Sequence, residues 1–282
     1  MDSNATLGSD AAGYGQNPDR PFATFVYALA TVVAAGTTDD TIMVMPGHTE
    51  TIGITGAAAM TLSVAGLKVI GLGGPTRKPA FLIDGFSNTY VSITGADTLI
   101  DNITWKAGHE DIASAIIVAA KGVTIRNCTF LENVATENFL ICISVGAANN
   151  DSDHVLIEGN QMYQPDTAST HAIWFVKDQN HCIVRRNLIQ GDYVADSAII
   201  GSPGTENFLN LAVTDNLIDN SAGDSAHVIE FAGTNTGICA RNLSGDVDAD
   251  GTPFIFTGGA MCENYHTGAD AASGFIYPAI DS

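Results

Sequence analysis

The sequence predicts an all-β fold, a single-stranded right-handed parallel β-helix in which coils of about 22 to 33 residues stack along one axis. Three observations predict it. Short strand-like segments recur at this period, 29 glycines provide for tight corners, and charged residues make up only 15% of the chain. A chain of 282 residues can form one such solenoid, and no linker divides it.

The first element expected along the chain is a capping helix. Turn-forming residues run through Asp19, and residues 21–36 are expected to form a helix with proline early and glycine at its end. Its apolar residues share one face at helical spacing: Phe22, Phe25, Val26, Leu29 and Val33. We expect this helix to cover the open end of the solenoid, where strand edges would otherwise be unpaired. The chain therefore divides into a loop and capping helix, 1–39, and the β-helix, 40–282.

Two series of strands then alternate. Each member of the first series is a strand, a corner with asparagine and a second short strand, and the corner asparagines are Asn160, Asn187, Asn216, Asn242 and Asn264. Asn102 and Asn127 stand one place sooner in earlier coils. Asparagine tolerates left-handed backbone angles, so we expect it to form the corner and to hydrogen-bond between coils in a ladder. The residues before it alternate in sign and are expected to pair across coils: Arg186, Asp215, Arg241 and Glu263.

The second series supplies one strongly apolar strand to each coil. Its members are residues 115–118, 140–143, 172–175, 198–200, 228–231, 254–256 and 275–277. The five cysteines show no CxxC pair, so neither a disulfide framework nor a zinc site is indicated. Four of them lie in apolar strand patterns and are expected to be buried thiols: Cys128, Cys142, Cys182 and Cys239.

The N-terminal region carries a recognisable pattern. Residues 8–10, 17–24, 27–30 and 41–50 read GSD, NPDRPFAT, YALA and TIMVMPGHTE. This pattern resembles the N-terminal signature of pectate-lyase-like β-helix proteins, particularly β-helix proteins of tailed phages and their marine relatives. The resemblance covers the capping helix, the first strand and, through the repeats, most of the chain. It implies the fold, whereas this architecture serves lyases, hydrolases, epimerases, tailspikes and virion coat components alike.

The charge balance limits the classes of partner that the protein is expected to bind. Eleven basic against 31 acidic residues give a formal net charge of −20, which repels phosphate backbones, so nucleic acid is not an expected partner. The N-terminus lacks the pattern of a signal peptide, and no apolar run approaches the ~18 residues that span a membrane. We therefore expect a protein made in a cytoplasm, with no membrane association. The resemblance to phage β-helix proteins implies that this is the host cytoplasm and that the protein is located in the virion.

Candidate catalytic residues are sparse. β-Eliminating lyases need basic residues, which this chain largely lacks, and the motif combination of polygalacturonase-like hydrolases is absent. Asp215 and Asp219 are the fallback carboxylate pair for glycoside hydrolysis, against a reading as a corner ion pair and a solvated turn. His171 and His227 precede second-series strands of different coils and Ser197 lies in the intervening coil, but the sequence defines no nucleophile–base geometry for them.

Acidic residues gather in the loops that join the first series to the second, and would form a stripe if the coils stack. Such a stripe would bind cations, meet a basic partner or keep the protein soluble. Its densest point, Asp246, Asp248 and Asp250, resembles the start of a calcium loop. Thr257 stands where a complete EF-hand loop has glutamate, so only a partial Ca²⁺ site is expected, and no other cofactor.

Two functions remain open. The first is a non-enzymatic bacteriophage virion protein, a capsid decoration or head-associated β-helix that binds coat proteins and host-surface glycans. The second is a lyase or hydrolase that degrades polysaccharide, as a tailspike-like depolymerase does. No amphipathic helix closes the C-terminal end after Pro278, so we expect homo-oligomerisation, as a trimer by analogy with phage β-helix proteins.

Overall fold

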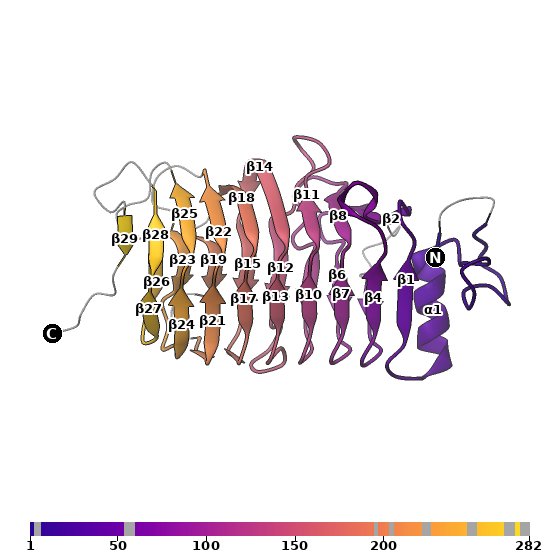
Figure 1. Cartoon of the computed structure of the whole chain (residues 1–282), viewed down its shortest axis with the longest axis horizontal. Coiled ribbons are helices and arrows are strands. Elements are labelled where there is room, and N and C mark those ends of the chain that lie inside the picture. The colour runs from indigo at the N-terminus through magenta and orange to yellow at the C-terminus, as the bar shows by residue number, and fades with distance from the viewer. Residues whose placement is uncertain are drawn as a thin grey trace.

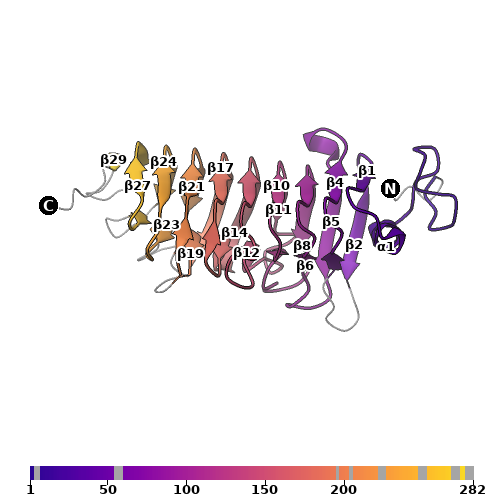
Figure 2. The same ribbon diagram turned by 90° about the horizontal axis from the view of Figure 1, so that it is seen from below.

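The computed structural model describes residues 1–2, 7–53, 60–194, 197–202, 206–221, 227–246, 253–267 and 274–276. It forms a right-handed parallel β-helix in which each coil gives one strand to each of three sheets (Figure 1). The view from below shows the same coils side by side along the long axis (Figure 2). The predicted fold class is therefore confirmed.

The first sheet comprises, in spatial order and within the described ranges, β1 (Thr41–Val44), β4 (Lys68–Gly71), β7 (Leu99–Asp101), β10 (Thr124–Arg126), β13 (Leu156–Glu158), β17 (Ile183–Arg185), β21 (Leu211–Thr214), β24 (Gly237–Ala240) and β27 (Ala260–Cys262). Its register confirms the predicted period. Thr124 pairs with Leu156, the widest offset at 32 residues, and Ile238 pairs with Ala260, the narrowest at 22.

The second sheet follows the corner and contains β2 (Thr49–Gly53), β5 (Ala80–Asp84), β8 (Thr104–Ala107), β11 (Thr129–Leu131), β14 (Gln161–Ser169), β18 (Leu188–Tyr193), β22 (Leu217–Asn220), β25 (Leu243–Asp246), β28 (Asn264–His266) and β29 (Gly274–Ile276). The sequence predicted that residues 275–277 would continue the second series of strands, and this prediction was wrong. β29 lies antiparallel to β28 instead of continuing the parallel second series. Such a strand covers the last edge of the second sheet.

The third sheet corresponds to the second series of the sequence. It contains β3 (Met60–Leu62), β6 (Val91–Ile93), β9 (Ile116–Val118), β12 (Ile141–Val145), β15 (His171–Phe175), β19 (Ser197–Gly201), β23 (His227–Phe231) and β26 (Phe254–Phe256). A short pair, β16 (Gln179–Asn180) with β20 (Phe208–Leu209), and a 3₁₀ turn, η1 (Pro75–Arg77), complete the described elements.

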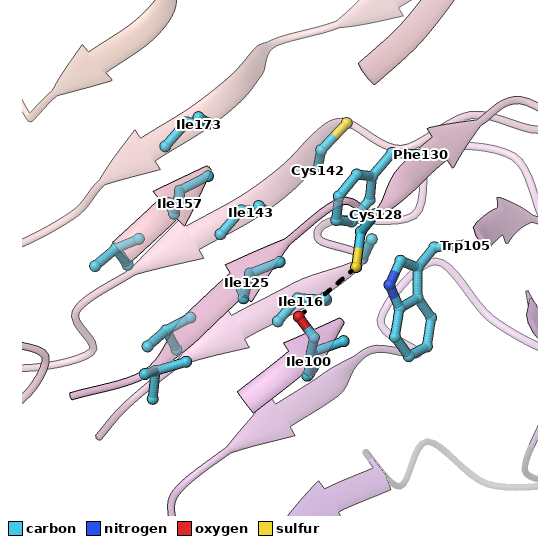
Figure 3. Close-up of a cluster of buried hydrophobic side chains, with 14 of the residues drawn as sticks. Ile100, Trp105, Ile116, Ile125, Cys128, Phe130, Cys142, Ile143, Ile157 and Ile173 are labelled. Carbon is cyan, nitrogen blue, oxygen red and sulfur yellow. Dashed lines mark hydrogen bonds between the residues drawn. The ribbon is translucent and has the colours of Figure 1, made fainter. Parts of the chain in front are cut away.

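The core is built from columns of side chains that stack from coil to coil. Figure 3 shows isoleucines from the first and third sheets, including Ile100, Ile125 and Ile157 from one register column. The inward column of the second sheet changes size along the solenoid, in the order Phe81, Trp105, Phe130, Met162, Ile189, Ile218, Ser244 and His266. The four cysteines predicted to be buried are buried, and burial raises the pKa of the Cys128 thiol to about 12.

The corner between the first and second sheets corrects one prediction. The left-handed residue in the later coils is the one before the asparagine: Gly159, Arg186, Asp215, Arg241 and Glu263 have φ between 54° and 65°. In the earlier coils Asn102 and Asn127 take that conformation themselves, with φ of 59° and 53°. Asparagine therefore occupies two different positions: the left-handed residue itself in the earlier coils, and the residue after it in the later coils. The expectation that asparagine forms the corner did not distinguish these positions.

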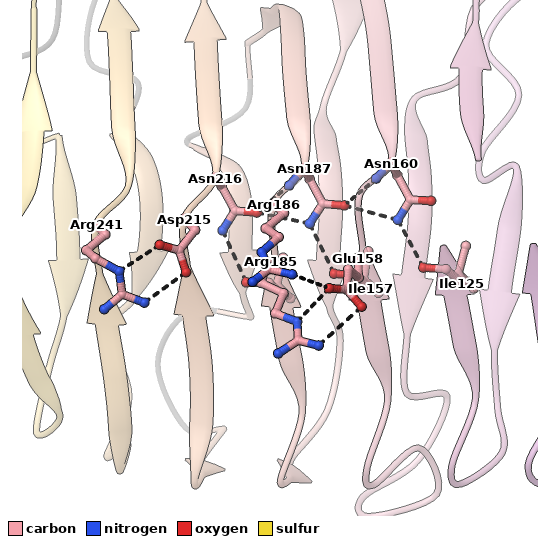
Figure 4. Close-up of polar contacts among 11 residues, drawn as sticks. Ile125, Ile157, Glu158, Asn160, Arg185, Arg186, Asn187, Asp215, Asn216 and Arg241 are labelled. Atoms are coloured by element: carbon pink, nitrogen blue, oxygen red, sulfur yellow. Dashed lines mark hydrogen bonds and ion pairs between the residues drawn. The ribbon is translucent and has the colours of Figure 1, made fainter. Parts of the chain in front are cut away.

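The predicted ladder is present. In the later coils its asparagines lie one position after the residue with left-handed backbone angles. The side-chain oxygen of Asn187 accepts hydrogen bonds from the backbone N–H and the amide of Asn160, each at 3.0 Å. Its own amide donates to Ile157 O and to Asn216 Oδ1 (Figure 4). The pattern continues through Asn242 to Asn264. These asparagines are at most 1% exposed, so the ladder satisfies polar groups that water does not reach.

Ion pairs flank the ladder on its outer side. Arg241 donates to both oxygens of Asp215, at 2.7 and 2.9 Å, as the alternation of sign predicted. Arg186 instead donates to Glu158, which Arg185 also holds, so its predicted partner Asp215 was wrong. The reason is that Glu158 stands at the same corner in the preceding coil.

Helix α1 (Phe25–Ala35) lies at the N-terminal end of the stack, as predicted (Figure 1). It starts after the N-cap Thr24, so Pro21 precedes the helix and does not belong to its first turn. Phe25, Ala28 and Leu29 are buried, whereas Val26 and Val33 are 54% and 44% exposed. The predicted apolar face was therefore too broad, because only a narrow side of the helix meets the end of the solenoid.

No helix in the described ranges is both long enough and apolar enough to cross a membrane.

Candidate functional site

A cluster of polar and aromatic side chains lies on the outer face of the third sheet, across β15, β19 and β23. Trp174 is half-buried between the fully buried Ile173 and Phe175, and strand alternation directs it outward. It is in register with Ile200 and, one coil further, with Glu230. Parallel stacking therefore brings an indole and a carboxylate to one column, in which Ser144 and Ile200 are the direct register partners of Trp174.

Hydrogen bonds link this cluster across three coils. Ser197 Oγ donates to Glu230 Oε2 at 3.3 Å, and Trp174 Nε1 donates to Ser202 Oγ at 3.1 Å. The ring of His171 lies 5.7 Å from that of Trp174, tilted by 46°. We refer to His171, Trp174, Ser197, Ser202 and Glu230 as the third-sheet cluster.

The histidine of this cluster has a defined tautomer. His171 Nδ1 lies 2.7 Å from the backbone carbonyl oxygen of Ser197, and a carbonyl oxygen only accepts, so Nδ1 carries a hydrogen. Ser197 is fully buried and His171 is 8% exposed, which fixes both side chains beneath the more exposed Trp174 and Glu230. The cluster thus has a rigid base and two groups that reach solvent.

The chemistry of the cluster suits recognition of a polyhydroxylated molecule. A partly exposed indole offers a flat apolar surface, while the carboxylate accepts hydrogen bonds and the hydroxyl groups accept or donate them. The described part of this face supplies one carboxylate to the cluster, Glu230, whereas most glycosidases need two.

Part of this cluster was expected from the sequence, but its geometry was not. His171 and His227 precede second-series strands and Ser197 lies in the intervening coil, and Ser197 does pair with His227 in register. Trp174 and Glu230 were not predicted. Their signal in the sequence is a large residue with a polar group at the third place of two apolar strands, 172–175 and 228–231.

The fallback catalytic pair occupies a different sheet. Asp215 lies at the corner between β21 and β22, where the hydrogen bonds and charge of Arg241 lower the pKa of its carboxyl group. Asp219 is exposed on the outer face of β22 and accepts a hydrogen bond from Gln190. A general acid needs a raised pKa, so the environment of Asp215 does not suit it to that role.

The predicted calcium residues are mostly outside the described ranges. Asp246 ends β25, and Asp248 and Asp250 lie beyond the described residues. Within the ranges that the structure describes, no group of three or more His, Cys, Asp and Glu side chains is arranged to hold a metal ion. The acidic stripe was expected in loops, but Asp192 and Asp219 belong to strands β18 and β22.

Comparison with known proteins supports the fold but does not identify a family. No family model matches the sequence, and no curated protein matches it. The tailspike protein of Escherichia coli bacteriophage HK620, solved in complex with a pentasaccharide, has a similar structure with a TM-score of 0.51 and 11% identity. That similarity covers 90% of this chain and 56% of the tailspike chain, so this chain spans little more than half of the tailspike's length.

Two structures of PfbA, a surface adhesin of Streptococcus pneumoniae, are also similar. Both share 13% identity and cover 93% of this chain, with TM-scores of 0.43 and 0.47 and coverage of 79% and 85% of the adhesin chains.

Proposed function

We propose that this chain is a non-enzymatic structural protein of a bacteriophage particle, a capsid decoration protein that binds coat proteins and, through the third-sheet cluster, a host-surface glycan. The observation that carries the binding role is the outward Trp174, hydrogen-bonded to Ser202, with Glu230 two coils further along the same column. The proposed assembly is a homotrimer. The tailspike likeness and the N-terminal resemblance support a place in a phage particle.

The rigidity of the cluster supports binding over catalysis. Its groups are fixed by hydrogen bonds between coils, so little side-chain entropy would be lost when a ligand binds. A depolymerase would need a second catalytic carboxylate or a set of cations near Glu230, and the cluster offers a single carboxylate among the described residues. The tailspike in the comparison was solved with a pentasaccharide, which supports an oligosaccharide as the ligand class.

The test of the binding role is an array of bacterial surface oligosaccharides probed with the purified protein. We expect Trp174→Ala to weaken the strongest signal at least tenfold, because the stacking surface is lost, and Trp174→Phe to retain most of it. Tyr163→Ala removes an outward aromatic on the second sheet, 45% exposed, and is the matched control. Equal binding by Trp174→Ala and the parent protein would refute a role for the cluster.

The same material distinguishes binding from degradation. A polysaccharide bound by the protein should keep its chain length after prolonged incubation, as measured by size-exclusion chromatography with light scattering. Shortening of the chain that Glu230→Gln abolishes would favour the depolymerase alternative.

The proposed location on the capsid has to be tested on the virus particle itself. Cryo-electron microscopy of virions should show copies of a β-helix of this size in ordered positions on the shell. Ordered copies on the tail, or none on the particle, would overturn the capsid decoration role.

A further inference from the structure

The outer face of the second sheet carries an apolar column that the proposed binding face does not use. Leu188, Leu217, Leu243 and Tyr265 occupy the same register position in four successive coils. They are 40%, 45%, 41% and 38% exposed, so each presents a substantial part of its side chain to solvent. In two preceding coils, the same position holds Thr129 and Gln161, so the column begins at Leu188.

This column borders a shallow groove of about 330 Å³. The groove is lined by Leu188, Leu217 and Leu243 together with Gln190, Asp219 and Thr267. Large exposed apolar residues in consecutive coils form a continuous strip, which a monomeric protein rarely leaves in water. The strip therefore indicates a contact surface.

The distribution of charge on this side of the molecule favours a second copy of the chain as the partner. The chain has a net charge of −20, so two copies repel each other over most of their surface. The corner beside the column carries three basic and three acidic residues, and is locally neutral: Glu158, Arg185, Arg186, Asp215, Arg241 and Glu263. A second copy can approach this side at little electrostatic cost.

Symmetry supports the same occupant. A rotation axis that runs along this column, parallel to the solenoid, keeps every coil at its own height, so the identical columns of the copies meet at the axis. This holds for the three-fold axis of the proposed homotrimer. Asp219 of one copy then lies at the height of Asp215 of the next copy, and Arg241 already compensates the charge of Asp215.

We propose that the column of Leu188, Leu217, Leu243 and Tyr265 is the subunit contact of a homo-oligomer in which copies stand side by side about an axis parallel to the solenoid. This inference rests on the oligomer that the proposed function includes and names its surface. Packing of leucine and tyrosine side chains from two copies removes apolar area from water on both sides.

The first experiment measures mass in solution. Sedimentation of the full chain at ~20 µM and 0.15 M NaCl should give an oligomer, and Leu217→Lys should give a monomer. Thr51→Lys is the matched control, because it adds the same charge at an exposed outward position at the other end of the same sheet. Circular dichroism must show both variants folded. A monomeric parent protein, or equal dissociation by both variants, would overturn the inference.

The second experiment tests the identity of the contact. In a Cys262→Ser background, which removes the exposed native thiol, Leu217→Cys should form a covalent dimer on mild oxidation. Thr51→Cys should remain monomeric under denaturing electrophoresis. An oligomer without the Leu217→Cys cross-link would place the contact elsewhere.

The outcomes separate this inference from the proposed function. If the interface is wrong but the function is right, a monomer still binds oligosaccharide in a Trp174-dependent way. If the function is wrong, the Leu217-dependent oligomer forms without binding any oligosaccharide on the array.

Discussion

At the scale of single residues, the corner joins an unfavourable conformation to a favourable set of hydrogen bonds. Arg186, Asp215, Arg241 and Glu263 adopt left-handed backbone angles, which cost a non-glycine residue roughly 1–2 kcal/mol. The asparagine that follows each of them is buried, and Asn187, Asn216 and Asn242 are hydrogen-bonded to the coils on either side, whereas Asn264 is hydrogen-bonded to the preceding coil. The ladder therefore holds the strained corner in place.

The ladder predicts a large effect for one buried amide. Asn187→Ala leaves the backbone N–H and one amide hydrogen of Asn160 without their acceptor. Because both donors are buried, we expect the free energy of unfolding to fall by about 2–4 kcal/mol. Urea denaturation measures it, with Asn149→Ala, in an exposed turn, as the control. Equal stability of the two variants would show that the ladder adds nothing.

The Asp215–Arg241 pair predicts a pH dependence. Hydrogen bonding to Arg241 lowers the pKa of Asp215 in the folded state, so the pair stabilises the protein above the unfolded pKa of about 4. This contribution disappears as the pH falls through the lower folded pKa. Asp215→Asn should therefore cost up to about 1 kcal/mol at pH 7, and progressively less below pH 4. Urea titrations at several pH values test this, with Asp219→Asn as the comparison.

The sequence predicted which residues repeat but not which of two neighbours makes the corner. Arginine and glutamate do not favour left-handed angles, and of the four residues before the asparagines only Asp215 is of a type that does. The recurring asparagine was therefore the better candidate in the sequence. The alternation of sign correctly paired Arg241 with Asp215. It failed for Arg186, because Glu158 in the preceding coil was not included in the column.

At the scale of elements, helix α1 is closed at both ends by specific groups. Glu50 from β2 accepts hydrogen bonds from the backbone N–H groups of Phe25 and Val26, and Gly36 ends the helix with φ of 67°. The ring of Phe25 lies 5.2 Å from that of Phe81. The helix is thus tied to the first coils by its N-terminus and its buried aromatic residue.

The helix end yields a prediction about conformation alone. An added Cβ at Gly36 would meet no atom within 4 Å, so Gly36→Ala should cost about 1 kcal/mol through its left-handed backbone. Gly74→Ala is the control, because Gly74 has φ of −80° and equally open space. Hydrogen exchange across α1 should accelerate in the first variant only. Faster exchange in both would point to a general loosening of the N-terminal end.

The predicted helix was correct in place and wrong in its exposed face. Helical spacing grouped Val26 and Val33 with Phe25, because α1 contains no charged residue to mark its solvent side. Sequence periodicity cannot show how much of an apolar helix its neighbours cover.

At the scale of the whole molecule, the fold was predictable and the candidate site was not. Repeats along the chain specify stacking, so three strands per coil followed from two series of segments. The third-sheet cluster depends on which side chains of separate coils face outward at equal height. Trp174 and Glu230 are 56 positions apart in the sequence and share one column, two coils apart, only through the register of β15, β19 and β23.

The net charge predicts a salt dependence of stability. Stacking brings many carboxylates together in one rod with a charge of −20, and screening reduces their repulsion. The Debye length falls from about 30 Å at 0.01 M to about 3 Å at 1 M salt. We therefore expect the melting temperature, measured by differential scanning calorimetry, to rise with NaCl across this range. A flat or falling profile would mean that local ion pairs outweigh the global repulsion.

The changing size of the inward column of the second sheet has a consequence for folding. A solenoid of identical coils could misfold by slipping one full coil, because every strand would still find a parallel partner. Here such a slip would place Trp105 at the level of Phe81 or Phe130, and would bring Met162 into a layer shaped for an aromatic ring. The differences in side-chain size along this column thus favour one alignment of the coils over alignments that are shifted by one coil.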